Sequence, residues 1–339
     1  MAAAPAQDRT VTLHAIDLGQ QAAFSLDELT SKVDLQGKPL PGWALYPAAV
    51  AWALQEAGYE ITGLQAAYHS DIPIGSGLSS SAAVEVAFAV TWQALGGWPA
   101  DRMTLAKLCQ RGENAYVGVS SGLMDQFASA HGIEDHALFF DTRSFEWSPV
   151  ALPKATALVI ADSGVRRTLS TSGYNDRRAS CEEAVAILSK YKPGIRSLRD
   201  ISPPELAAFS EFLPETVHRR AEHVVKEIHR VETAVTALRK GETRSFGALM
   251  YAVHASVRDL YEVSTPELDT LVEIAKRLPG CLGARLTGAG FGGCTVNLVE
   301  EGFADNFIRA LKQEYEEKTP RQAQVYLCRA SNGATTSII

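Results

Sequence analysis

The sequence PIGSGLSSSAAVE at Pro73–Glu85 decides how the rest of this chain is interpreted. Gly75 and Gly77 can adopt backbone conformations that a Cβ forbids, so their amide groups can turn toward one point. Ser79–Ser81 add hydroxyl groups where a helix over residues 82–95 is predicted to begin, and a helix N-terminus attracts anions. The stretch therefore predicts a site for nucleotide phosphates, although a capped loop without a ligand has the same composition.

The same stretch excludes two better-known phosphate-binding loops. A Walker A loop needs Gly-Lys-Ser/Thr after its glycines, and none follows here. A dinucleotide-binding fingerprint needs a third glycine at position 80, which is Ser80. The predicted phosphate loop contains no lysine, so its positive charge and metal must come from other parts of the chain. Its residues are Gly75, Ser76, Gly77, Leu78, Ser79, Ser80 and Ser81.

Length and composition indicate a globular protein of two domains. The 339 residues are 46% hydrophobic and 21% charged, which suits more than one core. The net charge of −7 argues against a nucleic-acid partner. Five widely spaced cysteines without a CxxC pair predict reduced thiols, with neither a disulfide framework nor a zinc site. No apolar run reaches about 20 residues and no secretory signal is found, so we expect a cytoplasmic protein without a membrane partner.

Periodicity along the chain predicts an α+β fold. Predicted strands cover residues 11–16, 63–70 and 156–162, a hairpin covers 136–152, and predicted helices cover 43–58, 104–116 and 122–131. Residues 174–278 are predicted to be almost wholly helical. The tail is predicted as strand 283–287, glycine turn 288–293, strand 294–300, helix 303–318 and strand 324–329. We therefore place an N-terminal domain at residues 1–155 and a C-terminal domain at 156–339.

Two acids in the segment GENAYVGVSSGLMDQFAS, Gly112–Ser129, are candidates for chemistry. Asp125 stands among apolar neighbours and could act as general base toward a substrate hydroxyl. Glu113 could then be the carboxylate ligand that a hydroxyl-rich phosphate loop needs for Mg²⁺. Either acid could equally be a solvated residue on a helix surface.

Two further segments have the composition of binding loops. The turn GAGFGG, Gly288–Gly293, has little side-chain bulk, so its backbone can approach a ligand or simply form a tight hairpin. Tyr174 is flanked by arginines, a combination that suits a sugar or a phosphate as well as a solvated loop. The histidines show no HExxH spacing and no GxSxG occurs, which disfavours zinc and α/β-hydrolase sites.

Taken together, three of these segments resemble the GHMP small-molecule kinases. PIGSGLSSSAAVE, SSGLMDQFAS and LTGAGFGGCTV resemble the second motif, the catalytic-aspartate segment and the third motif of that superfamily, in the same order. DSGVRRTLSTSGYNDRRASCEEA, HVVKEIHRVETAVTALRKG and YEVSTPELDTLVEIA are similar to galactokinase sequences within it. The resemblance extends from about residue 8 to residue 329.

The resemblance implies a two-lobed α+β fold with an active-site cleft between the lobes, and ATP and Mg²⁺ as cofactors. By position, Gly75–Ser81 would hold the ATP phosphates, and Ser81 with Glu113 would hold Mg²⁺. Asp125 would be the base toward the anomeric hydroxyl of galactose. The other residues implied at the substrate are Tyr174 and Gly122, and those implied to line the cleft are Gly288, Gly290 and Gly292.

The family's first motif, similar to RVNLIGEHTDYNGG, is absent from this sequence. In the family it supplies an arginine beside the catalytic aspartate and the acids that grip the sugar. We therefore expect an N-terminally shortened galactokinase in which the strand at residues 11–16 is left as an exposed sheet edge.

The sequence leaves three functions open. The first is an ATP-dependent galactokinase that forms galactose 1-phosphate, as a monomer or a weak homo-oligomer. The second is a homologue that binds sugar or nucleotide with impaired catalysis. The third is a sister kinase for arabinose or N-acetylgalactosamine.

Overall fold

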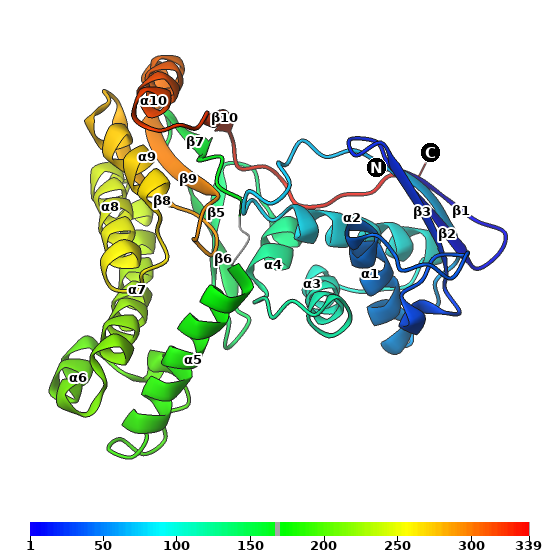
Figure 1. The fold of residues 1–339 in the computed structure, drawn as a ribbon, viewed down its shortest axis with the longest axis horizontal. Coiled ribbons are helices and arrows are strands. Elements are labelled where there is room, and N and C mark those ends of the chain that lie inside the picture. Colours follow the sequence, from blue (N-terminus) through cyan, green and yellow to red (C-terminus); the bar gives the residue numbers. More distant parts are fainter. Residues whose placement is uncertain (167–169, 339) are drawn as a thin grey trace. The chain divides into compact units, whose positions relative to one another are not determined.

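The computed structural model describes residues 1–166 and 170–338, which form two compact units (Figure 1). The first unit comprises Met1–Pro73, Ser79–Pro149 and Ala330–Ile339. The second comprises Val150–Arg329 together with the short segment Ile74–Leu78. These two units differ from the predicted domains 1–155 and 156–339 in two places. The first part of the phosphate loop, Ile74–Leu78, groups with the second unit, and Ala330–Ile339 groups with the first.

A four-stranded sheet with the order β1-β4-β2-β3 opens the first unit. Its strands are β1 (Ala2–Pro5), β2 (Thr10–Ala15), β3 (Gln20–Ser25) and β4 (Leu64–Tyr68). β2 pairs in parallel with β4 on one side and antiparallel with β3 on the other. The prediction of an exposed edge at residues 11–16 is therefore wrong, because β1 covers β4 and both sides of β2 are hydrogen-bonded.

Helices and one hairpin complete the first unit. They are α1 (Leu45–Glu56), α2 (Ser80–Gly96), α3 (Arg102–Arg111), the π-helical turn η3 (Gly112–Val117), α4 (Met124–His131), β5 (His136–Phe140) and β6 (Trp147–Ala151). Seven of the twelve α1 residues are buried, so α1 lies inside the unit against α2, α3 and η3. The predicted hairpin is confirmed by the pairing of β5 with β6.

The boundaries of three predicted helices differ in the structure. α2 begins at Ser80, two residues before the predicted start, and α4 begins at Met124, two residues after it. The predicted helix 104–116 ends as an α-helix at Arg111 and continues as η3. Gly112 permits this change close to α1, because a Cβ there would lie 2.7 Å from the Ala49 carbonyl oxygen.

The second unit is built on an antiparallel sheet with the order β10-β7-β9-β8. Its strands are β7 (Thr156–Asp162), β8 (Cys281–Leu286), β9 (Cys294–Glu300) and β10 (Gln324–Cys328). The apolar run at 156–162 is confirmed as a buried strand, since β7 pairs with β9 and with β10. β8 and β9 form a hairpin around the glycine turn.

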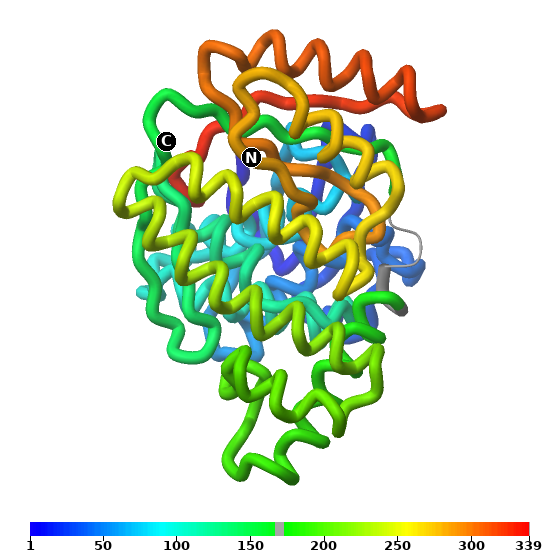
Figure 2. Tube along the Cα trace, turned by 90° about the vertical axis from the view of Figure 1, so that its left-hand side faces the viewer, coloured from blue at the N-terminus to red at the C-terminus, as the bar shows by residue number. Residues whose placement is uncertain are grey.

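Helices occupy most of the second unit between β7 and β8, as the sequence predicted. They are α5 (Ser170–Leu188), α6 (Pro203–Ala208), α7 (Glu215–Arg239), α8 (Thr243–Asp259) and α9 (Pro266–Arg277), with α10 (Ala304–Lys318) following β9. The long helices α7 and α8 pack side by side across a short connection (Figures 1 and 2). No helix among the described residues is long and apolar enough to cross a membrane.

The C-terminal tail returns to the first unit after β10. Gly333 N donates to Gly132 O at 2.7 Å, and Ala334 N donates to Ser129 O at 2.9 Å. A Cβ at Gly333 would lie 2.6 Å from the Ala130 carbonyl oxygen, so glycine permits this close approach. The tail therefore packs directly against the C-terminal end of α4.

Candidate active-site residues

Ser79 connects the phosphate loop to α2 in an unusual backbone conformation. Its φ of 61° lies in the left-handed region, which costs a residue other than glycine about 1–3 kcal/mol. Its side chain does not cap the helix, although a serine at that position often does. The first amides of α2 are thus not satisfied by the Ser79 hydroxyl, which suits an anion at the helix N-terminus.

The other half of the phosphate loop lies against an arginine of the second unit. A Cβ at Gly75 would be 3.7 Å from Arg166 Cδ. Arg166 Nη1 donates to both carboxylate oxygens of the buried Asp162, at 2.9 and 2.8 Å, and the arginine side chain remains 48% exposed. The sequence analysis noted an arginine-rich loop but did not connect it with the phosphate loop. The signal was the sequence DSGVRR immediately after a buried strand.

Glu113 lies on η3, and its carboxylate faces the start of α2. Ser81 Oγ donates to Glu113 Oε1 at 3.3 Å, and Ser121 Oγ donates to Glu113 Oε2. Gln126 Nε2 also donates to Glu113 Oε2, at 2.9 Å. The structure therefore brings together the two predicted metal-binding residues and adds two donors that the sequence analysis did not name.

This oxygen pair fits Mg²⁺ better than a softer metal, because Mg²⁺ prefers carboxylate, hydroxyl and phosphate oxygens. Over the described residues, no group of three or more His, Cys, Asp or Glu side chains could hold a metal. Mg²⁺ commonly uses one or two protein oxygens and completes its shell with substrate phosphates and water. Ser81 and Glu113 are therefore suited to hold a nucleotide-bound ion.

A second buried acid, Glu85, is connected to Glu113 through the side chain of Gln126. Gln126 Nε2 donates to Glu85 Oε2 at 2.9 Å, so one amide group contacts both carboxyl groups. Glu85 and Gln126 are fully buried. Burial, and secondly the charge of Glu113, raise the pKa of Glu85 to about 9. The sequence analysis missed Glu85, although an acid within the apolar run AAVEVAF was a visible signal.

Asp125 occupies the first turn of α4, next to Gln126. The predicted apolar surroundings are only partly present, since Leu123 and Phe127 are buried while Met124 is 61% exposed. The Asp125 side chain is partly accessible rather than enclosed. Gly122, the other predicted substrate residue of this segment, lies exposed before the helix. A partly accessible carboxylate can accept a proton from a substrate that arrives from solvent.

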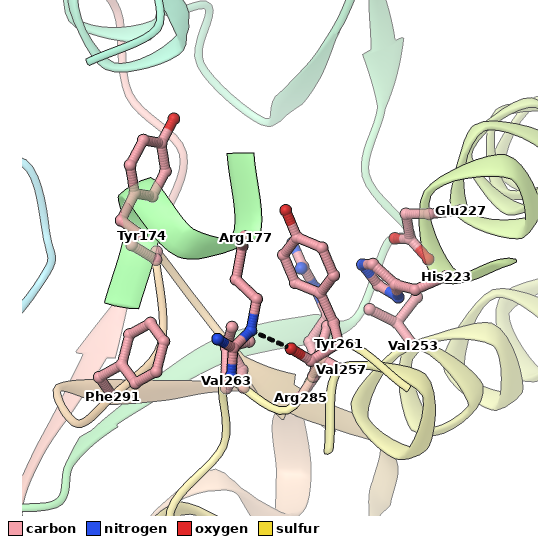
Figure 3. Close-up of a pocket in the computed structure, with 13 residues that line it drawn as sticks. Tyr174, Arg177, His223, Glu227, Val253, Val257, Tyr261, Val263, Arg285 and Phe291 are labelled. Atoms are coloured by element: carbon pink, nitrogen blue, oxygen red, sulfur yellow. Dashed lines mark hydrogen bonds between the residues drawn. The ribbon is translucent and has the colours of Figure 1, made fainter. Parts of the chain in front are cut away.

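Tyr174 lines a pocket of about 240 Å³ within the second unit (Figure 3). Arg177 Nε donates to the Tyr261 carbonyl oxygen at 2.6 Å, and Arg177 Nη2 donates to the Glu262 carbonyl oxygen at the same distance. The remaining lining residues are His223, Glu227, Val253, Val257, Val263, Arg285, Leu286, Gly288, Ala289 and Phe291. Of the predicted site residues, Tyr174 and Gly288 are thus brought to one pocket.

Two titratable side chains, His223 and Arg285, are among the residues that line this pocket. Burial, and secondly the charge of Arg230, lower the pKa of His223 to about 4, so its ring is neutral near pH 7. His223 Nδ1 lies 2.9 Å from Ser256 Oγ. Burial lowers the pKa of the Arg285 guanidinium, and the charge of Glu227 opposes this shift. The pocket therefore combines the neutral ring of His223 with the guanidinium of Arg285, whose charge is favoured by Glu227.

The glycine turn makes close backbone contacts instead of carrying functional side chains. A Cβ at Gly290 would lie 2.2 Å from the Val263 carbonyl oxygen, and one at Gly292 would lie 2.7 Å from that of Val165. Both glycines have positive φ and are buried, whereas Gly288 is exposed. Of the three predicted cleft glycines, Gly288 lines the pocket of Figure 3, and Gly290 and Gly292 fix the shape of the turn.

Comparisons with known proteins identify the family. The model of the GHMP kinases N terminal domain matches residues 46–133, and that of the GHMP kinases C terminal domain matches residues 234–317. A protein of Roseiflexus sp. strain RS-1 named galactokinase is 45% identical over 98% of this chain and 83% of the relative. This chain belongs to the galactokinase family. A galactokinase of Chloroflexus aurantiacus is 40% identical over 99% of this chain and 84% of its own length.

Solved structures place this galactokinase family member in the same fold. The structure of Lactococcus lactis galactokinase complexed with galactose matches with a TM-score of 0.91 and 36% identity, covering 98% of this chain and 85% of that one. The Methanococcus jannaschii mevalonate kinase matches in fold, with a TM-score of 0.65 and 19% identity over 97% of this chain and 87% of that one. The predicted α+β GHMP kinase fold is confirmed. The chain is a kinase, a phosphotransferase whose family implies use of ATP.

Proposed function

We propose that this enzyme transfers the γ-phosphoryl group of ATP to galactose and forms galactose 1-phosphate and ADP. The observation that carries the proposal is the similarity to the galactose complex of Lactococcus lactis galactokinase over almost the whole chain. The Ser81–Glu113 contact and the accessible Asp125 supply the residue types that such a reaction needs.

Asp125 is proposed as the general base. Its carboxylate accepts the proton of the anomeric hydroxyl, the freed oxygen forms a bond to the γ-phosphorus, and ADP leaves as the bond to the β–γ bridging oxygen breaks. General-base catalysis contributes about 10²–10⁴-fold to a rate. Tyr174, in the pocket of the second unit, and Gly122 are proposed to contact the sugar.

The Gly75–Ser81 loop is proposed to hold the ATP phosphates. The α2 amides not satisfied by Ser79 and the guanidinium of Arg166 beside Gly75 both favour an anion there. Arg166 is proposed to supply the positive charge that the loop itself lacks. Bound Mg²⁺ would neutralise charge on the phosphates, and Ser81 with Glu113 is the oxygen pair that would hold it.

The deciding experiment measures ADP release with ATP, Mg²⁺ and one sugar at a time. Galactose, arabinose and N-acetylgalactosamine are compared by kcat/KM, with a sugar-free reaction as the background. Galactose is expected to give the highest kcat/KM. A preference for another sugar would assign a sister kinase, and ATP binding without turnover on any sugar would assign a binding homologue. Sedimentation of the same sample tests the predicted monomer or weak homo-oligomer.

A further inference from the structure

We propose that Glu85 and Gln126 form a carboxylic acid–amide pair, in which Glu85 Oε1 donates its proton to Gln126 Oε1, and that this pair positions Glu113. The proposal rests on the proposed function only in taking Glu113 as a metal ligand. Glu85 and Gln126 are positioning residues, because they act on the metal through Glu113.

Hydrogen-bond accounting is the first argument. Gln126 Nε2 uses its two protons on Glu85 Oε2 and Glu113 Oε2, both at 2.9 Å. Within the described part of the chain, the two atoms Glu85 Oε1 and Gln126 Oε1 are buried without a hydrogen-bond partner. An ionised carboxylate and an amide oxygen are both acceptors and cannot bond each other. One proton on Glu85 Oε1 would satisfy both atoms at once, as buried polar groups require.

The second argument is the charge around Glu85. Glu85 on α2 is electrostatically coupled to acidic groups on four other helical elements. They are the buried Glu113 on η3, the partly accessible Asp125 on α4, Tyr46 on α1 and Cys109 on α3. No cation is among the groups that shift the Glu85 equilibrium. A second buried anion beside Glu113 would be uncompensated, which is far more costly than a neutral acid.

The pair has a direct consequence for Glu113. Donation from Gln126 fixes Glu113 Oε2, while Oε1 points to Ser81. The amide of Gln126 cannot rotate without breaking its bond to Glu85. Loss of an outer partner of a metal ligand typically weakens metal affinity or activity about 10–100-fold.

The test measures Mn²⁺ affinity by electron paramagnetic resonance in the presence of a non-hydrolysable ATP analogue and without sugar. Glu85→Gln is expected to keep the affinity within about twofold, because an amide can replace the neutral acid in the pair. Glu85→Leu is expected to weaken it about tenfold. Equal weakening by both substitutions, or no weakening by Glu85→Leu, would overturn the proposal.

A matched control separates positioning from general destabilisation. Asn297 is equally buried but lies on β9 of the second unit. Asn297→Leu is expected to lower the melting temperature without changing Mn²⁺ affinity. If Glu85→Leu does not fold, Gln126→Leu is used for the same comparison. Failure of Glu85→Gln to fold would itself contradict the proposal.

Protonation is tested separately by infrared spectroscopy at pH 7. The difference spectrum of the native enzyme and Glu85→Gln is expected to contain the carbonyl band of one protonated carboxylic acid. A carboxylate band in its place would overturn the assignment of the proton. Neither measurement contains galactose, so both decide this inference even if the sugar assay refutes the proposed function.

Discussion

Ser81 Oγ and Glu113 Oε1 lie 3.3 Å apart, although 32 positions separate these residues in the sequence. The contact joins the first turn of α2 to the π-helical turn η3. π-Helical turns inside helical segments occur frequently at functional sites, where the altered turn redirects a side chain. Here that side chain is a carboxylate directed at the phosphate-loop hydroxyl.

Glu113→Gln removes the anionic oxygen of this pair but preserves its shape. We expect Mn²⁺ affinity in the presence of an ATP analogue to fall by at least about tenfold, because Mg²⁺-type ions bind carboxylates far better than amides. Glu60→Gln alters an exposed acid of the same unit and serves as the control. Equal affinity in the two variants would exclude Glu113 as a metal ligand.

Asp125→Asn tests the base. The amide has nearly the same volume but cannot accept the substrate proton, so kcat for galactose is expected to fall about 10²–10⁴-fold. ATP affinity and the melting temperature are expected to change little, since Asp125 is not part of the buried network. Full activity of the variant would show that another group takes the proton or that no base is needed.

Arg166→Ala is expected to raise the KM for ATP about tenfold, because the guanidinium beside Gly75 is lost. Arg178→Ala is the matched control: both arginines pair with an acid four residues away, and both are about half exposed. If the two substitutions change the KM for ATP equally, Arg166 has no particular role at the phosphates. The stability of Arg166→Ala is measured in parallel, since the buried Asp162 loses a partner.

Gly290→Ala tests the glycine turn. Its Cβ would lie 2.2 Å from the Val263 carbonyl oxygen, and φ is +80°. We expect the free energy of unfolding to fall by more than about 2 kcal/mol. Gly241→Ala has a similar φ of +72° with open space around the added methyl group, so a loss of about 1 kcal/mol is expected. Equal losses in chemical denaturation would mean that the Val263 contact is unimportant.

The stability of the enzyme is expected to depend on pH through Glu85. Its pKa rises from 4.5 to about 9 on folding, so the folded state holds the extra proton between these values. The stabilisation is complete below about pH 4.5 and is lost as pH rises toward 9, with a slope of about 1 kcal/mol per pH unit. The free energy of unfolding of Glu85→Gln, measured by chemical denaturation at several pH values, should lack this pH dependence. Parallel profiles of the two proteins would contradict a proton on Glu85.

Much of the fold could be predicted because periodicity reports local structure directly. The strand at 156–162 and the hairpin at 136–152 were predicted within a few residues. The error at residues 11–16 has a physical cause: strand order depends on long-range pairing, and the parallel pairing of β2 with the distant strand β4, which leaves β2 internal, is not visible in local periodicity. The helix break at Gly112 depends on the approach of α1, which periodicity does not reveal.

The candidate site was predictable where the chemistry lies in contiguous motifs. Ser81, Glu113 and Asp125 stand in such segments. Glu85 and Arg166 were missed because their importance comes from residues distant in the sequence. Glu85 contacts Gln126, and Arg166 lies beside Gly75. A hydrogen-bonded partner such as Gln126, fully buried and shared between two acids, can be recognised only when the fold is known.

Because the C-terminal tail packs against α4, the first unit can be completed only after the second unit has been synthesised. Residues from Ala330 onward are synthesised after all of the second unit. Until then the Gly132 carbonyl oxygen lacks the amide of Gly333, and the C-terminal end of α4 (Met124–His131) lacks the tail that packs against it. A nascent chain stalled at Arg329 would therefore carry a complete second unit and an unfinished first one, although translation of the first began earlier.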